Sequence, residues 1–162
     1  SLYKDQLQDQ LSEIFSSDIV LDRKTATSNL DLYIKSENIL MMSLSTNNIT
    51  FEDFSGVEDM TKENAVQISI NSSLPYSLNA YLPTEIQNSD KSAIMDKDIL
   101  NIKENSESVY QTFANTIDKV VLKDNNQAGN DLIHGIDIKL KGGMVHEKDV
   151  YKTTIKFEVE QK

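Results

Sequence analysis

Strict alternation of apolar and polar residues near the end of the chain restricts its fold more than any other feature. From Tyr151 onward, apolar or aromatic residues share one parity, and charged or polar residues occupy the other parity through residue 160. The apolar set is Tyr151, Ile155, Phe157 and Val159, with Thr153 between them. A two-residue repeat predicts a β-strand over 149–160 that is buried on one face and solvated on the other.

The same alternation recurs upstream, with turn-forming residues between the repeats. It is clearest over 30–34, 66–70, 76–82 and 136–140. These repeats predict strands whose apolar sides meet in one interior. The residues expected to share that interior are Leu30, Leu32, Ile34, Val66, Ile68, Ile70, Ile136, Ile138, Leu140, Ile155, Phe157 and Val159.

Less regular segments predict the remaining elements. The dense apolar run over 39–44 indicates a strand that is buried on both faces or bent by a bulge. Short apolar runs predict strands over 19–21, 49–51, 109–113 and 120–122, and residues 84–108 are expected to form an irregular excursion between strands.

Many short strands without long helices between them favour an all-β fold, an antiparallel Ig-like or fimbrial-type β-sandwich. A small barrel is the alternative. A chain of 162 residues is long enough for one domain with its own core, which we place at 18–162.

The first seventeen residues depart from the strand pattern. Apolar residues recur there at helical spacing, which predicts a short amphipathic helix over 1–17. A helix this short is marginal alone, so its apolar stripe is expected to dock on its own domain or on a neighbouring subunit. The stripe consists of Tyr3, Leu7, Leu11, Ile14 and Phe15.

Composition excludes several classes of function. The net charge of −10 and the isoelectric point near 4.6 disfavour binding to nucleic acid or to anionic membranes. The absence of cysteine excludes disulfides, thiolate metal sites and cysteine nucleophiles. No run of eighteen apolar residues is present, so we expect no membrane insertion of this segment.

Candidate metal ligands are weak. His134 and His146 each lie near a glycine, and we expect both at surface or turn positions. The segment 124–131 resembles the start of a calcium loop, but its twelfth position is Gly135 where the motif needs glutamate, so a plain turn is favoured. The acidic loop with Glu52, Asp53, Glu58 and Asp59 is a second, weaker calcium candidate. In segment 124–131 the candidate calcium ligands are Asp124, Asn126, Asn130 and Asp131.

No catalytic signature accompanies the strands. The chain has no Gly-x-Ser-x-Gly motif and no glycine-rich phosphate loop, and carboxylate pairs in so acidic a chain carry no specificity. We therefore predict a protein that is not an enzyme and has no catalytic residue, metal or cofactor.

Two stretches resemble secreted bacterial fimbrial and spore-coat-type β-sandwich surface subunits. Residues 65–80 are similar to an alternating strand, a turn of small residues, a Pro75–Tyr76 step and a second strand. Residues 150–159 are similar to the closing strand of such subunits after a tyrosine. The resemblance implies a structural subunit of a pilus, fimbria or other filament in cell adhesion, which self-associates or binds other surface subunits.

The resemblance also implies a secreted or cell-surface location. Abundant Asn, Ser, Lys and Ile with a single arginine, Arg23, indicate an AT-rich genome, and we expect a low-GC Gram-positive bacterium as the source. The start at Ser1 suggests a mature or truncated form. The competing interpretation is a surface module that binds carbohydrate or peptide through an exposed row of tyrosines, for which the chain offers Tyr33, Tyr76, Tyr81 and Tyr110.

Overall fold

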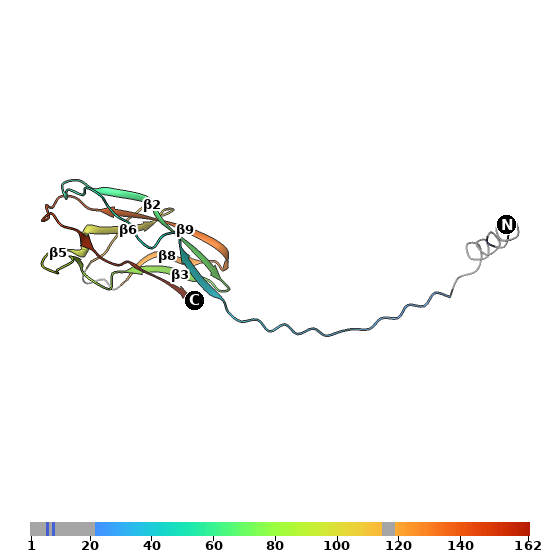
Figure 1. Cartoon of the computed structure of the whole chain (residues 1–162). Helices are drawn as coiled ribbons and strands as arrows, with labels where there is room; N and C mark the ends of the chain where they lie inside the picture. The colour runs from blue at the N-terminus through green and yellow to red at the C-terminus, as the bar shows by residue number, and fades with distance from the viewer. Residues whose placement is uncertain (1–5, 7, 9–21, 115–118) are drawn as a thin grey trace. The chain divides into compact units, whose positions relative to one another are not determined.

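The computed structural model describes residues 6, 8, 22–114 and 119–162 (Figure 1). The chain divides into two units, Ser1–Ser36 and Glu37–Lys162, and every strand of the described part belongs to the second unit. The helix predicted over 1–17 lies outside the described residues, apart from Gln6 and Gln8, and so does the strand predicted over 19–21.

Five antiparallel strands form the larger sheet, in the order β1-β2-β9-β6-β7. Its two long strands, β2 and β9, pair along most of their length, with a bulge between Lys62 and Val66. The bulge places Asn64 at a φ of 47°, where its backbone N–H donates a 2.8 Å hydrogen bond to Oδ1 of Asp137. The strands are β1 (Leu40–Leu44), β2 (Met60–Ser72), β9 (Gly129–Leu140), β6 (Leu100–Glu104) and β7 (Gln111–Thr112).

A smaller sheet has three antiparallel strands in the order β11-β3-β8. These are β11 (Lys156–Gln161), β3 (Tyr76–Tyr81) and β8 (Val120–Asn126). A third set of short strands, β10 (Tyr151–Lys152), β4 (Ile86–Asn88) and β5 (Ile94–Met95), lies in the order β10-β4-β5, and a single 3-10 turn, η1 (Lys97–Ile99), precedes β6. The strand predicted over 149–160 is therefore divided between two sheets, because the chain leaves β4 after Lys152 and joins β3 at Lys156.

The larger and the smaller sheet face each other across one core, with β2, β6 and β9 on one side and β3 and β8 on the other (Figure 1). Alternation decides which residues point inward: Ile68 and Ile70 of β2 and Leu78 and Ala80 of β3 are fully buried. Each buried aliphatic side chain stabilises the fold by about 1.5–3 kcal/mol relative to exposure. The all-β prediction is confirmed.

The predicted core is confirmed at its centre and only partly at its rim. Val66, Ile136 and Ile138 are buried together with Ile68 and Ile70. The closing strand and the end of β9 are half-buried and pack against this core, through Leu140, Ile155, Phe157 and Val159.

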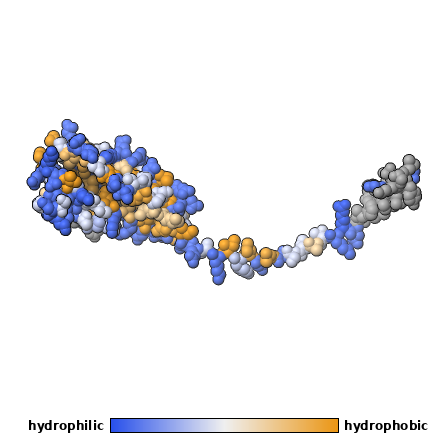
Figure 2. Space-filling model, viewed as in Figure 1, coloured by the Kyte–Doolittle hydropathy of each residue, from blue (hydrophilic) through white to orange (hydrophobic). Residues whose placement is uncertain are grey.

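The prediction for residues 30–34 is wrong. Leu30, Leu32 and Ile34 are 88%, 75% and 81% exposed, and no residue from 22 to 39 belongs to a strand or helix. Figure 2 shows apolar residues, coloured orange, exposed along the described part of the first unit. Alternation shows that a segment suits a strand with one apolar face, but a strand forms only where a neighbour supplies hydrogen bonds. The described part of the chain gives these residues no such neighbour.

The strand predicted over 39–44 is present as β1 (Leu40–Leu44), but it is neither buried on both faces nor bent by a bulge. β1 is an edge strand that pairs only with β2 among the described strands, and all five of its residues are exposed. The larger sheet has five strands and the smaller sheet has three. The smaller sheet therefore does not cover the whole of the larger one, and the apolar residues of β1 lie at the edge that it leaves open.

Segments with weaker patterns differ in detail. Ile49 and Phe51 pack against the core, half-buried, without forming a strand. The strand predicted over 109–113 shortens to the two residues of β7, and the excursion over 84–108 contains the core strand β6.

Candidate functional site

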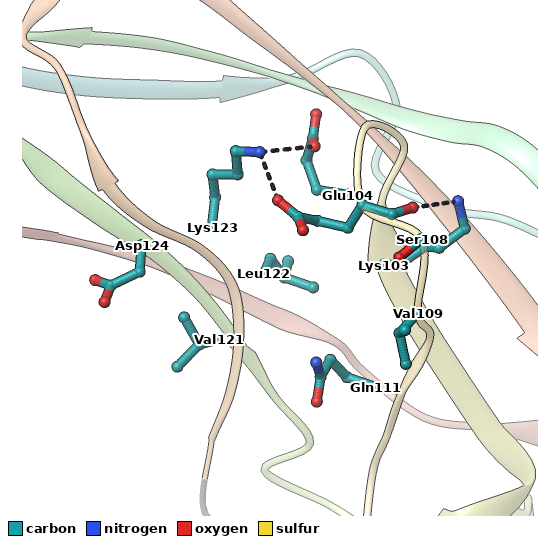
Figure 3. Close-up of a pocket in the computed structure, with 10 residues that line it drawn as sticks. Lys103, Glu104, Ser108, Val109, Gln111, Val121, Leu122, Lys123 and Asp124 are labelled. Atoms are coloured by element: carbon teal, nitrogen blue, oxygen red, sulfur yellow. Dashed lines mark hydrogen bonds and ion pairs between the residues drawn. The ribbon is translucent and has the colours of Figure 1, made fainter.

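A pocket of about 420 Å³ opens between the turn that follows β6 and the strand β8 (Figure 3). Its wall is mixed, with the exposed side chains of Val109 and Val121 beside charged groups. The charged residues that line it are Lys103, Glu104, Glu107, Lys123 and Asp124.

Ion pairs within the protein occupy the charged groups of this pocket. Nζ of Lys123 donates to Oε1 of Glu107 at 2.5 Å and to Oγ of Ser106 at 2.9 Å, and it lies 3.8 Å from Oε2 of Glu104. The bond to Glu107 raises the pKa of Lys123. Lys103 is held by Asp137 at 3.1 Å and by the backbone carbonyl of Glu107 at 3.0 Å. Both lysines thus pair with carboxylates of the protein itself.

A buried polar cluster lies beneath the pocket. The Tyr76 hydroxyl of β3 and Nε2 of His134 of β9 are 2.6 Å apart, and Oε1 of Glu104 of β6 lies 3.9 Å from Nδ1 of the same ring. Burial lowers the pKa of His134 and raises the pKa of Tyr76. This cluster joins the two sheets through their side chains.

The expectation that His134 lies at the surface is wrong, because the residue is 7% exposed. His134 shares its strand parity with Ile136 and Ile138, and the inner face of β9 continues through it. That parity was the signal in the sequence that could have placed it inward.

His146 follows β9 in a loop, with its ring edge-on to Tyr151 at a centroid distance of 6.4 Å. Within residues 22–114 and 119–162, no group of three or more histidine, aspartate or glutamate residues is placed to hold a metal ion. His134 and His146 therefore form no metal centre with a carboxylate in this part of the chain.

The two calcium candidates have other roles. Residues 124–131 form the hairpin between β8 and β9, and the Asp124 carboxylate accepts a hydrogen bond from the buried Ser77 hydroxyl, which lowers the pKa of Asp124. In the acidic loop, Asp59 accepts the backbone N–H of Gly142 at 2.7 Å, while Glu52, Asp53 and Glu58 are exposed.

The tyrosines considered for ligand binding do not form an exposed row in the second unit. Tyr76 is fully buried in the core. The ring of Tyr110 is covered by two ammonium groups, with Nζ of Lys139 4.4 Å and Nζ of Lys103 5.3 Å from its centroid. Tyr81 is half-buried on β3, and Tyr33 lies in the first unit.

The feature that most resembles an interaction site is the uncovered core edge, which we define as the inward face of β1. Leu40, Met42 and Leu44 lie opposite Ser72, Ile70 and Ile68 in register, so they point to the same side as the core residues of β2. Ile68 and Ile70 are 0% exposed, whereas Leu40, Met42 and Leu44 are 41%, 41% and 42% exposed. The layer that covers β2 therefore ends before β1.

The opposite layer ends close by. Gln161 of β11 donates hydrogen bonds to the backbone carbonyl of Ile39 and to the Ser72 hydroxyl, both at 3.0 Å, so the end of β11 meets the start of β1. Phe157 and Val159 of β11 remain half-buried against the core. Two edge strands thus leave apolar core groups partly open along one side of the second unit.

Comparison with known proteins adds no family. No protein-family model matches the chain, and no curated protein is similar enough to be a relative. Among the described residues, we find no helix with the length and apolar character of a membrane span.

Proposed function

We propose that this chain is a non-enzymatic structural subunit of a bacterial cell surface or filament, which associates with other copies by strand addition. In this proposal its fold is an Ig-like, fimbrial-type β-sandwich whose uncovered core edge accepts residues 30–34 of a second copy. The exposure of Leu40, Met42 and Leu44 on the core side of β1 is the observation that carries the proposal.

Edge strands attract additional strands because their outer N–H and C=O groups are unpaired. β1 pairs on one side with β2, and its other side has no strand among the described residues. A strand added there gains backbone hydrogen bonds, and its alternate side chains enter the open part of the core.

Residues 30–34 have the pattern that such an added strand requires. Leu30, Leu32 and Ile34 share one parity, the segment is as long as β1, and its apolar side chains are exposed. Burying three such side chains supplies about 5–9 kcal/mol before association costs. Covering the three apolar residues of the uncovered core edge adds to this, and the sum is comparable with the roughly 4–15 kcal/mol lost on association.

The source and location follow from composition and resemblance. The stretches that resemble fimbrial and spore-coat-type subunits correspond to the end of β2, β3, β10 and β11. β3 and β11 are antiparallel neighbours, with Phe157 opposite Ala80. We therefore propose a secreted or surface-attached protein of a low-GC Gram-positive bacterium, with a role in adhesion.

Analytical ultracentrifugation and negative-stain electron microscopy of the full chain test the proposal. We expect concentration-dependent association that Leu32→Asp weakens at least tenfold, because a carboxylate would enter the core. Tyr33→Asp is the matched control, since Tyr33 has the opposite parity and is equally exposed. Equal loss in both variants, or a monomer at millimolar concentration, contradicts self-association by this strand.

Cysteine cross-linking identifies the acceptor, because the chain has no cysteine of its own. Oxidation of a mixture of Leu32→Cys and Met42→Cys chains is expected to give a mixed dimer. Met41→Cys, on the other face of β1, is the control and should cross-link poorly. If the double variant Leu32→Cys/Met42→Cys forms only an intrachain bond at every concentration, the segment covers its own β1 and the filament proposal loses its basis.

A further inference from the structure

We propose that His134, Tyr76 and Glu104 form a proton-operated contact that holds the two sheets together at neutral pH and loosens them in mild acid. The contact lies on other strands than β1, since β9 and β6 carry it in the larger sheet, with β2 between β9 and β1, and β3 carries it in the smaller one. It therefore goes beyond the proposed assembly function.

The carboxylate beside the ring favours one direction of the hydrogen bond in the neutral state. Tyr76 and Nε2 of His134 are 2.6 Å apart, and the rings meet edge-on at a centroid distance of 5.9 Å. Oε1 of Glu104, 3.9 Å from Nδ1, favours the neutral tautomer that carries its hydrogen on Nδ1, and in that tautomer Nε2 accepts from the Tyr76 hydroxyl. All three residues are buried, which strengthens this hydrogen bond and makes an unpaired polar group costly.

Each element packed against the ring contributes a defined group. β3 contributes Tyr76, β6 contributes Glu104, and β8 contributes Lys123, while the partner of His134 in β2 is the apolar Ile68. Burial and the positive charge of Lys123 disfavour the imidazolium, and the negative charge of Glu104 favours it. Burial is the largest of these effects, so the neutral ring is the native form at neutral pH.

Protonation at Nε2 disturbs two contacts between the sheets at once. The nitrogen becomes a donor to the Tyr76 oxygen, so the hydroxyl hydrogen loses its acceptor, and within residues 22–114 and 119–162 that hydroxyl has no other hydrogen-bond partner. The imidazolium also attracts Glu104, which already accepts the backbone N–H of Ser106 at 3.0 Å and faces Lys123 at 3.8 Å. The ion pair between Glu104 of β6 and Lys123 of β8 is the second contact between the sheets, and it weakens when the imidazolium competes for the carboxylate.

Nuclear magnetic resonance of the imidazole groups tests the contact directly in the full chain. We expect His134 to titrate below 6.5, the ordinary pKa of histidine. Tyr76→Phe removes the donor to the neutral ring and should raise the pKa of His134, whereas Glu104→Gln removes the stabilising charge and should lower it further. A purely structural role of Tyr76 and Glu104 would leave the titration unmoved in both variants.

Denaturant unfolding between about pH 5 and pH 8 tests the consequence. The unfolding free energy of the wild type should fall as pH drops through 6.5, because unfolded His134 takes up a proton before folded His134 does. His134→Gln should flatten this slope, because the lowered pKa of His134 is its source. An unchanged slope in His134→Gln, or a His134 that titrates at or above 6.5, overturns the proposal. Neither result bears on strand addition at β1.

Discussion

Tyr76 shows how a single polar atom can stabilise an apolar core position. The side chain is fully buried, and its hydroxyl oxygen lies 2.6 Å from Nε2 of His134. Tyr76→Phe leaves the shape of the core intact but leaves Nε2 of His134 buried without a donor. We expect a loss of about 1–3 kcal/mol in the unfolding free energy at pH 7, measured by denaturant unfolding.

Tyr81 provides the control for this substitution. It lies on the same strand, β3, and is half-buried, so Tyr81→Phe should change the unfolding free energy by less than about 0.5 kcal/mol. If both substitutions have equal effects, the hydrogen bond to His134 does not contribute to stability.

The sequence predicted polar residues in this core less well than apolar ones. The inward position of His134 follows from the parity of β9, but its partners do not, because Tyr76 and Glu104 come from strands 58 and 30 residues away in the chain (134 − 76 and 134 − 104). Such proximity is set by the order of strands in two sheets, which alternation does not encode.

At the scale of elements, the turn after β9 depends on the close approach of two loops. The backbone N–H of Gly143 and of Met144 donate to the carbonyl of Gly56 at 2.8 and 2.9 Å. A Cβ at Gly142 would lie 2.6 Å from the carbonyl oxygen of Val57 and 2.7 Å from Cα of Glu58, so the two loops would have to separate. Gly142→Ala should therefore lower the unfolding free energy by about 1–3 kcal/mol, which thermal and denaturant unfolding can measure.

Gly129→Ala is the matched control for this element. The three heavy atoms nearest to its Cβ would all belong to the side chain of Leu132, at 3.1 Å or more, and that side chain can shift. We expect a change below about 1 kcal/mol. If Gly129→Ala is the more damaging substitution, the contact between the loops is not what restricts residue 142 to glycine.

Strands with clear alternation and a neighbour on each side were predicted correctly, whereas the paired core strand β6 lies in a segment that was expected to be irregular. Alternation located the inner faces of β2, β3 and β9 because each has a strand on both sides and a sheet opposite. It misplaced residues 30–34 because no strand of the described part pairs with them, and it misplaced β1 because burial there depends on where the opposite layer ends. The uncovered core edge could not be predicted from the sequence for the same reason.

At the scale of the whole molecule, the second unit contains every described core residue and every described strand. Residues 37–162 should therefore fold without the first unit, and the hydrogen bonds of Ile39 to Ser73 and Gln161 are retained in this fragment. We expect a cooperative thermal transition by circular dichroism. A fragment that stays unfolded would show that residues 1–36 belong to its core.

The fragment 37–162 then allows strand addition to be measured as binding in trans. A synthetic peptide of residues 28–37 should raise its melting temperature in a concentration-dependent manner, because a ligand that binds only the folded state stabilises it by about 2.7 kcal/mol at one hundred times its dissociation constant. A peptide of the same composition, scrambled so that Leu30, Leu32 and Ile34 no longer share one parity, should have no effect. The fragment with Met42→Asp should not respond to the native peptide either, since a charge would block the uncovered core edge. If the native and scrambled peptides act alike, the exposed alternation of residues 30–34 does not recognise β1. The proposed assembly would then need another contact.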